Sequence, residues 1–162
     1  MGFGLPAAIG AQVAFPSRLV IDVAGDGSIQ MNIQELATLA AYNLPIKIAI
    51  LNNGCLGMVR QWQEMFFDRR YSQVHLPAVP DFVRVAEAYG IKGLRASRSD
   101  EVSAVIDEAI RTDGPVLMDF QVEEEENVFP MVAPGAPLCD MIGDILYPVE
   151  NVHPEKAEEP FL

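Results

Sequence analysis

Apolar runs alternate with segments of helical periodicity along the first three quarters of the chain. The apolar runs predict four strands, over residues 19–24, 46–51, 91–95 and 115–122. Apolar positions spaced three and four apart predict five helices, over residues 5–15, 32–42, 56–67, 81–89 and from 99 onward. Strands that alternate with helices predict an α/β fold, with a doubly wound, mainly parallel sheet and helices on both of its faces.

The apolar positions also predict which side of each helix is buried. Polar residues at three helix starts, Asn32, Asp81 and Ser99, are expected to be N-caps. The helix over 56–67 carries an apolar stripe of its own, Met58, Trp62 and Met65 or Phe66. The stripes expected to face the sheet are Leu36, Leu39 and Ala40; Phe82, Val85, Ala86 and Tyr89; and Val102, Val105, Ile106 and Ala109.

Composition changes near residue 126, which predicts a boundary there. Residues 1–126 hold the strands and helices, and at this length they suit one domain with a sizeable core. Residues 127–162 contain six prolines, weak periodicity and many charges, so we expect an acidic, proline-rich tail. The last dozen residues are expected to be disordered.

Charge and cysteine content exclude several classes of function. The net charge is −12, and residues 123–162 hold ten acidic residues and one lysine, which leaves the predicted domain nearly neutral. A basic surface for nucleic acid is therefore not expected. No apolar run approaches the ~20 residues that cross a bilayer, so no membrane anchor is expected. Cys55 and Cys139 are too few and too far apart for a metal knuckle, and reduced thiols favour a cytoplasmic protein.

Two short polar motifs follow the first two long apolar runs. Gly25-Asp26-Gly27-Ser28 comes after the first run, and Asn52-Asn53 comes after the second. Ligands bind at the carboxyl edge of open α/β sheets, where these motifs are expected to meet. Asp26 and Asn53 offer hard oxygen ligands for a divalent cation, and a glycine turn lets backbone N–H groups face phosphate oxygens. Each motif alone is also a common turn or strand end.

Taken together, these motifs resemble the thiamine diphosphate signature, in which GDG is followed some two dozen residues later by NN. Other stretches resemble the C-terminal domain of the acetohydroxyacid synthase (acetolactate synthase) catalytic subunit, over roughly residues 1–145. Gly-Met-Val-Arg-Gln-Trp-Gln at residues 57–63 is the most specific of them. The others are Met1-Gly-Phe-Gly-Leu-Pro-Ala-Ala-Ile-Gly10, Arg70-Tyr-Ser72, Gly114-Pro-Val-Leu117 and Pro130-Met-Val-Ala-Pro-Gly135.

The resemblance implies a site for thiamine diphosphate and Mg²⁺. It implies that Asp26, Asn53 and the backbone carbonyl of Cys55 ligate the metal. Met1 matches the bulky apolar residue against which this family bends the cofactor, and Met58 and Trp62 match residues of the substrate pocket, although core packing is the alternative for an isolated pair of this kind. The residues implied to contact the cofactor are Met1, Gly25, Asp26, Gly27, Ser28, Asn53, Cys55, Leu56, Gly57 and Met58.

The resemblance also implies a reaction and partners for a longer protein. Acetolactate synthase is a transferase of branched-chain amino-acid biosynthesis, leading to valine, leucine and isoleucine. It condenses two pyruvates, or pyruvate and 2-ketobutyrate, with loss of CO₂. The family's activating glutamate lies in an N-terminal domain and FAD is held mostly by a middle domain, so we expect this chain to be a fragment, cut at an internal methionine and inactive alone. The full subunit is expected to form a homodimer or tetramer, with a possible regulatory small subunit.

Three alternatives stay open. Another thiamine diphosphate enzyme, such as a pyruvate oxidase, a decarboxylase or a different carboligase, would share Asp26 and Asn53. A non-catalytic module would bind the cofactor without turnover. Gly2-x-Gly4-x-x-Ala7 with Asp22 imitates a dinucleotide fingerprint, but that fingerprint must follow a strand and none is predicted before it.

Overall fold

The computed structural model describes residues 1–143. The expected disorder of the last dozen residues lies outside this described part. The chain divides into two compact units, Met1–Glu126 and Asn127–Leu162, and each is described here by itself.

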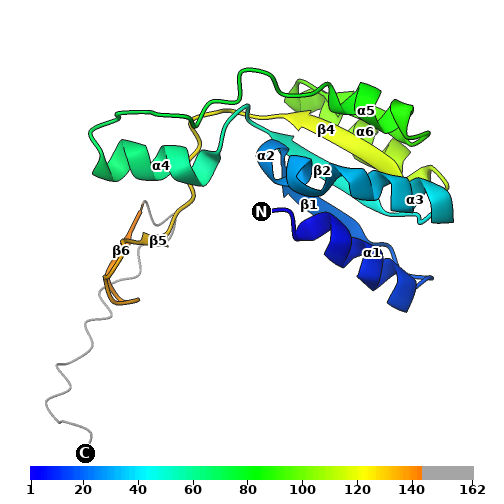
Figure 1. Ribbon diagram of the computed structural model, residues 1–162, viewed down its shortest axis with the longest axis horizontal. Helices are drawn as coiled ribbons and strands as arrows, with labels where there is room; N and C mark the ends of the chain where they lie inside the picture. The colour runs from blue at the N-terminus through cyan, green and yellow to red at the C-terminus, as the bar shows by residue number, and fades with distance from the viewer. Residues whose placement is uncertain (144–162) are drawn as a thin grey trace, which may run out of the picture. The chain divides into compact units, whose positions relative to one another are not determined.

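The first unit is built on one parallel sheet (Figure 1). All three strand pairs are parallel, in the order β1-β2-β4-β3. The four strands are β1 (Ile21–Gly25), β2 (Lys47–Asn52), β3 (Lys92–Ala96) and β4 (Val116–Gln121). The predicted strands and the predicted α/β fold are therefore confirmed, with strand ends displaced by one or two residues.

Six α-helices connect the strands of this unit or flank them. They are α1 (Gly4–Ala14), α2 (Asp26–Ile29), α3 (Leu36–Tyr42), α4 (Gly57–Phe66), α5 (Phe82–Ala88) and α6 (Val102–Arg111). Two 3₁₀ segments, Gln30–Glu35 and Ser99–Glu101, precede α3 and α6. The five predicted helices are all present, whereas α2 occupies the segment that was predicted to be a turn.

Two of the three predicted N-caps are wrong. Asn32 sits at a kink inside the 3₁₀ segment, with φ −134° and ψ 32°, and its side chain donates to the carbonyl of Gly2 instead of capping α3. Ser99 is the first residue of a 3₁₀ turn whose N-cap is Arg98, and the Glu101 side chain accepts the Arg98 N–H there. Asp81 does cap α5, because its Oδ1 accepts the Arg84 N–H at 3.4 Å.

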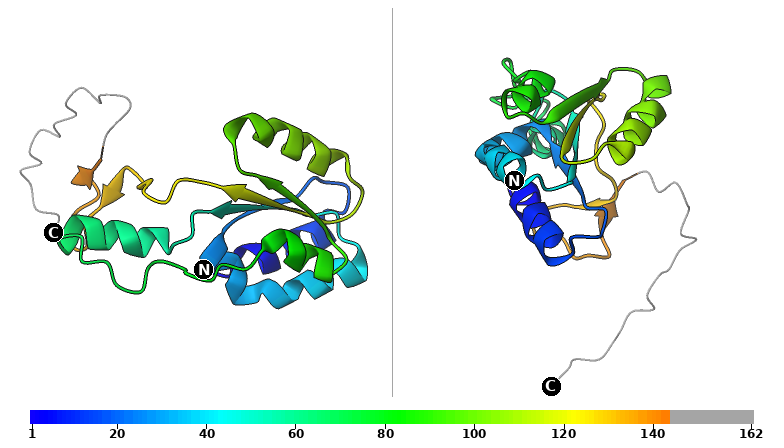
Figure 2. Two further views of the ribbon diagram at one scale, coloured as in Figure 1. Left: turned by 90° about the horizontal axis from the view of Figure 1, so that it is seen from above. Right: turned by 90° about the vertical axis from the view of Figure 1, so that its right-hand side faces the viewer.

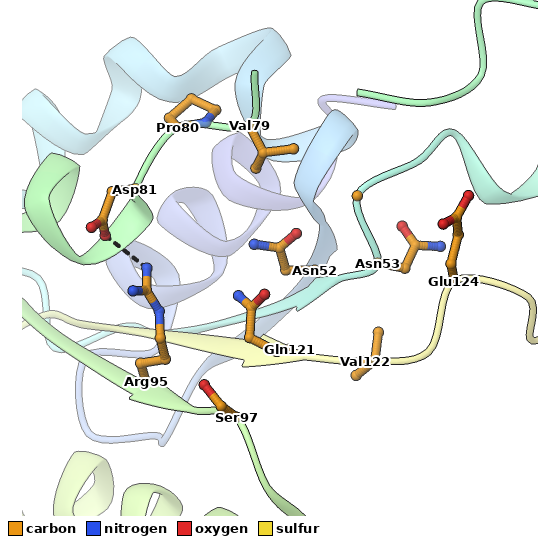
Figure 3. A pocket seen from close by; sticks show the side chains of 11 residues that line it. Asn52, Asn53, Val79, Pro80, Asp81, Arg95, Ser97, Gln121, Val122 and Glu124 are labelled. Carbon is orange, nitrogen blue, oxygen red and sulfur yellow. Dashed lines mark hydrogen bonds and ion pairs between the residues drawn. The ribbon is translucent and has the colours of Figure 1, made fainter. Parts of the chain in front are cut away.

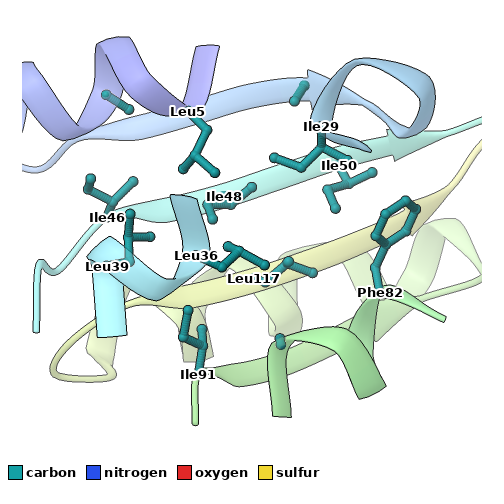
Figure 4. Close-up of a cluster of buried hydrophobic side chains, with 13 residues drawn as sticks. Leu5, Ile29, Leu36, Leu39, Ile46, Ile48, Ile50, Phe82, Ile91 and Leu117 are labelled. Atoms are coloured by element: carbon teal, nitrogen blue, oxygen red, sulfur yellow. The ribbon is translucent and has the colours of Figure 1, made fainter. Parts of the chain in front are cut away.

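The larger core lies between one face of the sheet and helices α1, α3 and α5 (Figure 4). The predicted stripes on α3 and α5 face this core, with Leu36, Leu39, Phe82 and Ala86 fully buried. The sheet contributes alternate residues of its central strands, Ile48 and Ile50 from β2 and Leu117 from β4. This alternation follows from the two-residue period of a strand.

The opposite face of the sheet is covered by α6 over β3 and β4 (Figure 2). Ala109 is fully buried there, and Val102 and Val105 pack around it, as predicted. Ile106 was also predicted to be buried, but it is 37% exposed. On the same face of the sheet, Val23 of β1 and Leu51 of β2 are also exposed.

Helix α4 lies beyond the carboxyl end of the sheet rather than against either face (Figure 1). Its apolar stripe is largely exposed, at Met58, Trp62 and Phe66. None of the described helices is long and apolar enough to span a membrane. The second unit contains a short antiparallel pair, β5 (Met131–Val132) and β6 (Met141–Ile142), which the weak periodicity did not predict.

Candidate cofactor site

The two polar motifs meet at the carboxyl edge of the sheet. Gly25 is the last residue of β1 and lies opposite Leu51, the penultimate residue of β2. Asp26 therefore leaves β1 beside the point where Asn52 and Asn53 leave β2. Parallel pairing places both motifs at one edge, although Asn52 comes 24 positions after Ser28 in the sequence.

Asp26 joins the two motifs through its carboxylate. Its side chain is 1% exposed, and Oδ1 accepts the N–H of Gly27 at 2.9 Å. Oδ2 accepts the N–H of Gly54, also at 2.9 Å, from the turn after β2. A carboxylate has about four lone-pair directions, so two such bonds leave room for a cation.

The electrostatic environment of Asp26 disfavours its charged form when no cation is bound. Burial raises the pKa of the carboxyl above its ordinary value, and the nearby charge of Asp119 adds to this. The N–H groups of Gly27 and Gly54 act in the opposite direction, because they stabilise the carboxylate. A divalent cation at this position would offset the cost of burying the charge.

The turn after β2 is held by local backbone geometry. Asn53 Oδ1 accepts the Cys55 N–H at 3.2 Å, and Gly54 has a φ of +68°, which a side chain would strain. Cys55 is buried and forms an antiparallel bridge with His75, next to a 2.8 Å bond from the Leu56 N–H to the Val74 carbonyl. Burial raises the pKa of the Cys55 thiol, so this side chain stays protonated and its contribution to a site is limited to its backbone.

The Gly25–Ser28 segment differs from the predicted glycine turn. Gly25 has extended backbone, with φ −78° and ψ 158°, and Asp26 begins helix α2. A Cβ at position 27 would lie 2.7 Å from Leu56 Cδ2, the end of a flexible side chain, so a larger residue would require Leu56 to move. Gly27 thus lies inside α2 and packs close to the residue before α4, where we had expected a glycine turn.

The first residues of the chain are attached to this segment. The Gly2 N–H donates to Ser28 Oγ at 3.0 Å, and Asn32 Nδ2 donates to the Gly2 carbonyl. Met1 is exposed, yet its Cε lies 3.6 Å from where a Cβ of Gly27 would be. Its side chain is therefore next to the segment that carries Asp26.

All ten residues implied to contact the cofactor line one pocket of about 390 Å³. They are Met1, Gly25, Asp26, Gly27, Ser28, Asn53, Cys55, Leu56, Gly57 and Met58. Sequence reasoning missed its other lining residues, Val23, Ala24, Leu51 and Val59, because the strand pattern assigns them only to the sheet and the helix. Trp62 does not line this pocket. It lies one turn further along α4, where its ring centroid is 6.1 Å from that of Phe66 in an edge-to-face arrangement.

The pocket suits an anionic ligand that binds together with a cation. Helix α4 begins at Gly57 in the pocket wall, and the N–H groups of a first helical turn carry partial positive charge. Among residues 1–143 no group of three His, Cys, Asp or Glu side chains could hold a metal. Asp26 and Asn53 would therefore bind a cation weakly by themselves, and oxygens of the ligand would have to complete its coordination.

Comparison with protein families and known proteins gives related sequences for most of the chain. The family described as thiamine pyrophosphate enzyme, C-terminal TPP binding domain, matches residues 1–120. The acetolactate synthase large subunit of Porphyra purpurea is 54% identical over 144 residues, which are 88% of this chain and 24% of that protein. The Escherichia coli K12 acetolactate synthase isozyme 2 large subunit is 51% identical over 142 residues, 88% of this chain and 26% of that protein.

Two further relatives extend the comparison. The mitochondrial acetolactate synthase catalytic subunit of Saccharomyces cerevisiae is 49% identical over 142 residues, 88% of this chain and 20% of that protein. A solved structure, the thiamine diphosphate-dependent 4-hydroxybenzoylformate decarboxylase of Rhodococcus jostii RHA1, is 36% identical with a TM-score of 0.72 and covers 78% of this chain and 24% of that one. The chain thus spans about a quarter of the length of these relatives.

Proposed function

The chain belongs to the thiamine pyrophosphate enzymes as their C-terminal TPP binding domain, and on that premise we propose that it is the cofactor-binding part of an acetolactate synthase large subunit. The observation that carries this proposal is the buried Asp26 carboxylate, which accepts the Gly54 N–H. Asp26 lines a single pocket together with the nine other residues implied to contact the cofactor. About 50% identity to acetolactate synthase large subunits, against 36% to the decarboxylase, favours the synthase within the family.

Asp26, Asn53 and the backbone carbonyl of Cys55 are the proposed ligands of Mg²⁺. All three lie in the wall of the pocket, and both side chains are oxygen donors of the kind that Mg²⁺ prefers. Gly27, Ser28 and the first turn of α4 are proposed to hold the diphosphate through N–H and hydroxyl groups. Bound thiamine diphosphate would supply an electron sink for the carbanion left when a 2-keto acid loses CO₂.

The remaining pocket residues are proposed to position that group and to exclude water. Met1, Leu56 and Met58 supply apolar surface in the pocket wall, and Met1 is the proposed support for the bent cofactor. Met58 in the first turn of α4 and Trp62 one turn further along are the proposed contacts for the acceptor keto acid. Trp62 stays 39% exposed here, which fits a residue whose partner groups come from substrate or from another part of a longer protein.

For the longer protein we propose condensation of two pyruvates, or of pyruvate and 2-ketobutyrate, with loss of CO₂. FAD, assembly as a homodimer or tetramer, and a regulatory small subunit are proposed for that protein as well. Several relatives are named as large subunits, which favours a small-subunit partner. A cytoplasmic location is proposed, although the yeast relative is named as mitochondrial. The chain alone, with about a quarter of that length, is proposed to bind cofactor without turnover.

Calorimetric titration with thiamine diphosphate tests the site. The unmodified chain is expected to bind more tightly with Mg²⁺ than without it, and Asp26→Ala is expected to lose this difference. Asp100→Ala removes an exposed carboxylate that pairs with Arg98 outside the pocket and is the matched control. Equal binding by the chain and Asp26→Ala would refute the ligand assignment.

Product analysis tests the choice of enzyme. A longer protein that contains this chain is expected to form acetolactate from pyruvate. Release of acetaldehyde or acetate alone would instead favour a decarboxylase or an oxidase of the same family. Turnover of pyruvate by the isolated chain would contradict the proposal that it is inactive alone.

A further inference from the structure

A second, polar pocket of about 660 Å³ borders the Asn52–Gly54 turn (Figure 3). Its wall includes Asn52 and Gln121 from the ends of β2 and β4, and Arg95 from β3. Behind this wall is Asp119 of β4, whose carboxylate is fully buried. A buried carboxylate is costly unless charge and hydrogen bonds compensate it, so its partners are informative.

Asp119 accepts hydrogen bonds from three side chains. Arg95 binds Oδ2 through Nε at 3.0 Å and through Nη2 at 2.9 Å. Oδ1 accepts from Asn52 Nδ2 at 3.0 Å and from Gln121 Nε2 at 3.0 Å. Arg95 also pairs with Asp81 at the start of α5, at 2.7 Å, as the dashed line in Figure 3 shows. The carboxylate is thus fixed in one orientation.

These contacts lead to the proposed cation site. Asn52 is the last residue of β2, and Asn53 and Gly54 follow it directly. The Gly54 N–H then donates to Asp26. A continuous series of contacts therefore links Arg95 on β3, Asp119 on β4, the end of β2 and Asp26 after β1, following the strand order of the sheet. Neither Asp119 nor Arg95 lines the pocket that contains Asp26.

We propose that Asp119 and Arg95 are positioning residues for the cation site, acting through Asn52 to hold the turn that carries Asn53 and Gly54. This inference rests on the function proposed above. Backbone bonds also hold this turn, because the Leu76 N–H donates to the Gly54 carbonyl at 2.8 Å and the Val122 N–H donates to the Asn52 carbonyl at 3.0 Å. The Asn52–Asp119 bond adds a side-chain contact directly before Asn53.

Arg95→Met tests the inference, with Arg84→Met as the matched control. Arg84 pairs with the same Asp81, at 3.5 Å, but does not reach Asp119, and its side chain is exposed. The readout is the ratio of the thiamine diphosphate affinities with and without Mg²⁺. We expect Arg95→Met to lower this ratio by about tenfold, the low end of what removing a hydrogen bond to a metal ligand costs, because Arg95 acts through Asp119 and Asn52. Arg84→Met is expected to leave the ratio unchanged. General loosening would weaken both affinities and leave the ratio as it was.

Amide exchange gives a readout that needs no ligand. In Arg95→Met the Gly54 amide is expected to exchange about tenfold faster, the loss of roughly one hydrogen bond, while the Gly27 amide, bonded to the other oxygen of Asp26, keeps its rate. If Arg95→Met does not fold by circular dichroism, Asn52→Ala removes the connection to the turn and is expected to give the same two results.

The outcomes separate this inference from the function on which it rests. If the unmodified chain shows no Mg²⁺-dependent binding, the proposed function fails and this inference fails with it. If the chain binds and Asp26→Ala does not, but Arg95→Met or Asn52→Ala keeps the original ratio and the original Gly54 exchange, only the inference is overturned.

Discussion

Replacing Gly54 with alanine tests how the backbone serves the site. Gly54 has a φ of +68°, and a Cβ added to it would meet no atom within 4 Å, so the whole cost is backbone strain. The left-handed region costs an L-residue about 1–2 kcal/mol. If alanine keeps this φ, the chain loses that stability. If the backbone at position 54 of the variant instead relaxes to negative φ, its N–H turns away from Asp26. Binding of the cofactor must then restore the strained conformation, and each 1.4 kcal/mol spent on this weakens binding about tenfold.

Gly90→Ala is the matched control for this prediction. Gly90 follows α5 with a φ of +73° and the same open space, but its N–H donates to the Glu87 carbonyl and not to Asp26. Urea unfolding and titration with thiamine diphosphate and Mg²⁺ are measured on both variants. Gly90→Ala is expected to lose stability only, whereas the losses in stability and binding by Gly54→Ala are expected to sum to the same 1–2 kcal/mol. Unchanged stability together with unchanged binding in Gly54→Ala would refute the reasoning.

Three further predictions concern buried groups. Lys47 is buried with Nζ 2.8 Å from the Thr112 carbonyl and 2.6 Å from that of Gly114, so Lys47→Met is expected to cost about 2 kcal/mol in urea unfolding at pH 7. Burial lowers the pKa of Lys47, so the unfolded chain keeps the proton on this ammonium group to higher pH than the folded chain does. The free energy of unfolding is therefore expected to rise with pH between the lowered pKa and 10.5, and Lys47→Met is expected to lack this rise. Asp22 is 5% exposed, its Oδ2 has no hydrogen-bond partner among the described residues, and burial raises its pKa. Its charge therefore lowers stability as pH rises from 3.8 through the raised pKa, and Asp22→Ala is expected to gain about 1 kcal/mol at pH 7 and little below pH 4; an equal gain at both pH values would contradict this. Phe82→Ala empties a fully buried position and is expected to cost about 3–5 kcal/mol in the same assay, and a cost below 1 kcal/mol would show that the site collapses or is not buried.

The sequence by itself determined the order and type of the main elements. Period-two and period-three-to-four patterns are local, so the strands and the helices that cover them were predicted to within a few residues. The faces of α3 and α5 were predicted for the same reason. The motif residues were found because glycine, aspartate and asparagine are informative where a strand ends.

Local patterns failed where distant segments decide. Gly27 packs close to the side chain of Leu56, and the Asn32 side chain donates to the carbonyl of Gly2 instead of capping α3. Ile106 has the period of a buried residue, but it is 37% exposed and lies outside the cluster that packs α6 on the sheet. The apolar stripe of α4 is exposed for the same kind of reason, because an apolar pattern predicts burial without naming the surface that buries it.

The candidate site shows the same division. Its residue types were readable from the sequence because each motif carries its own chemistry. Only the parallel pairing of β1 with β2 brings Asp26 to the Gly54 N–H, and only the sheet order places Arg95 and Asp119 behind Asn52. Hydrogen bonds between residues 24 to 67 positions apart leave no periodic trace in a sequence, so the tertiary structure alone could supply them.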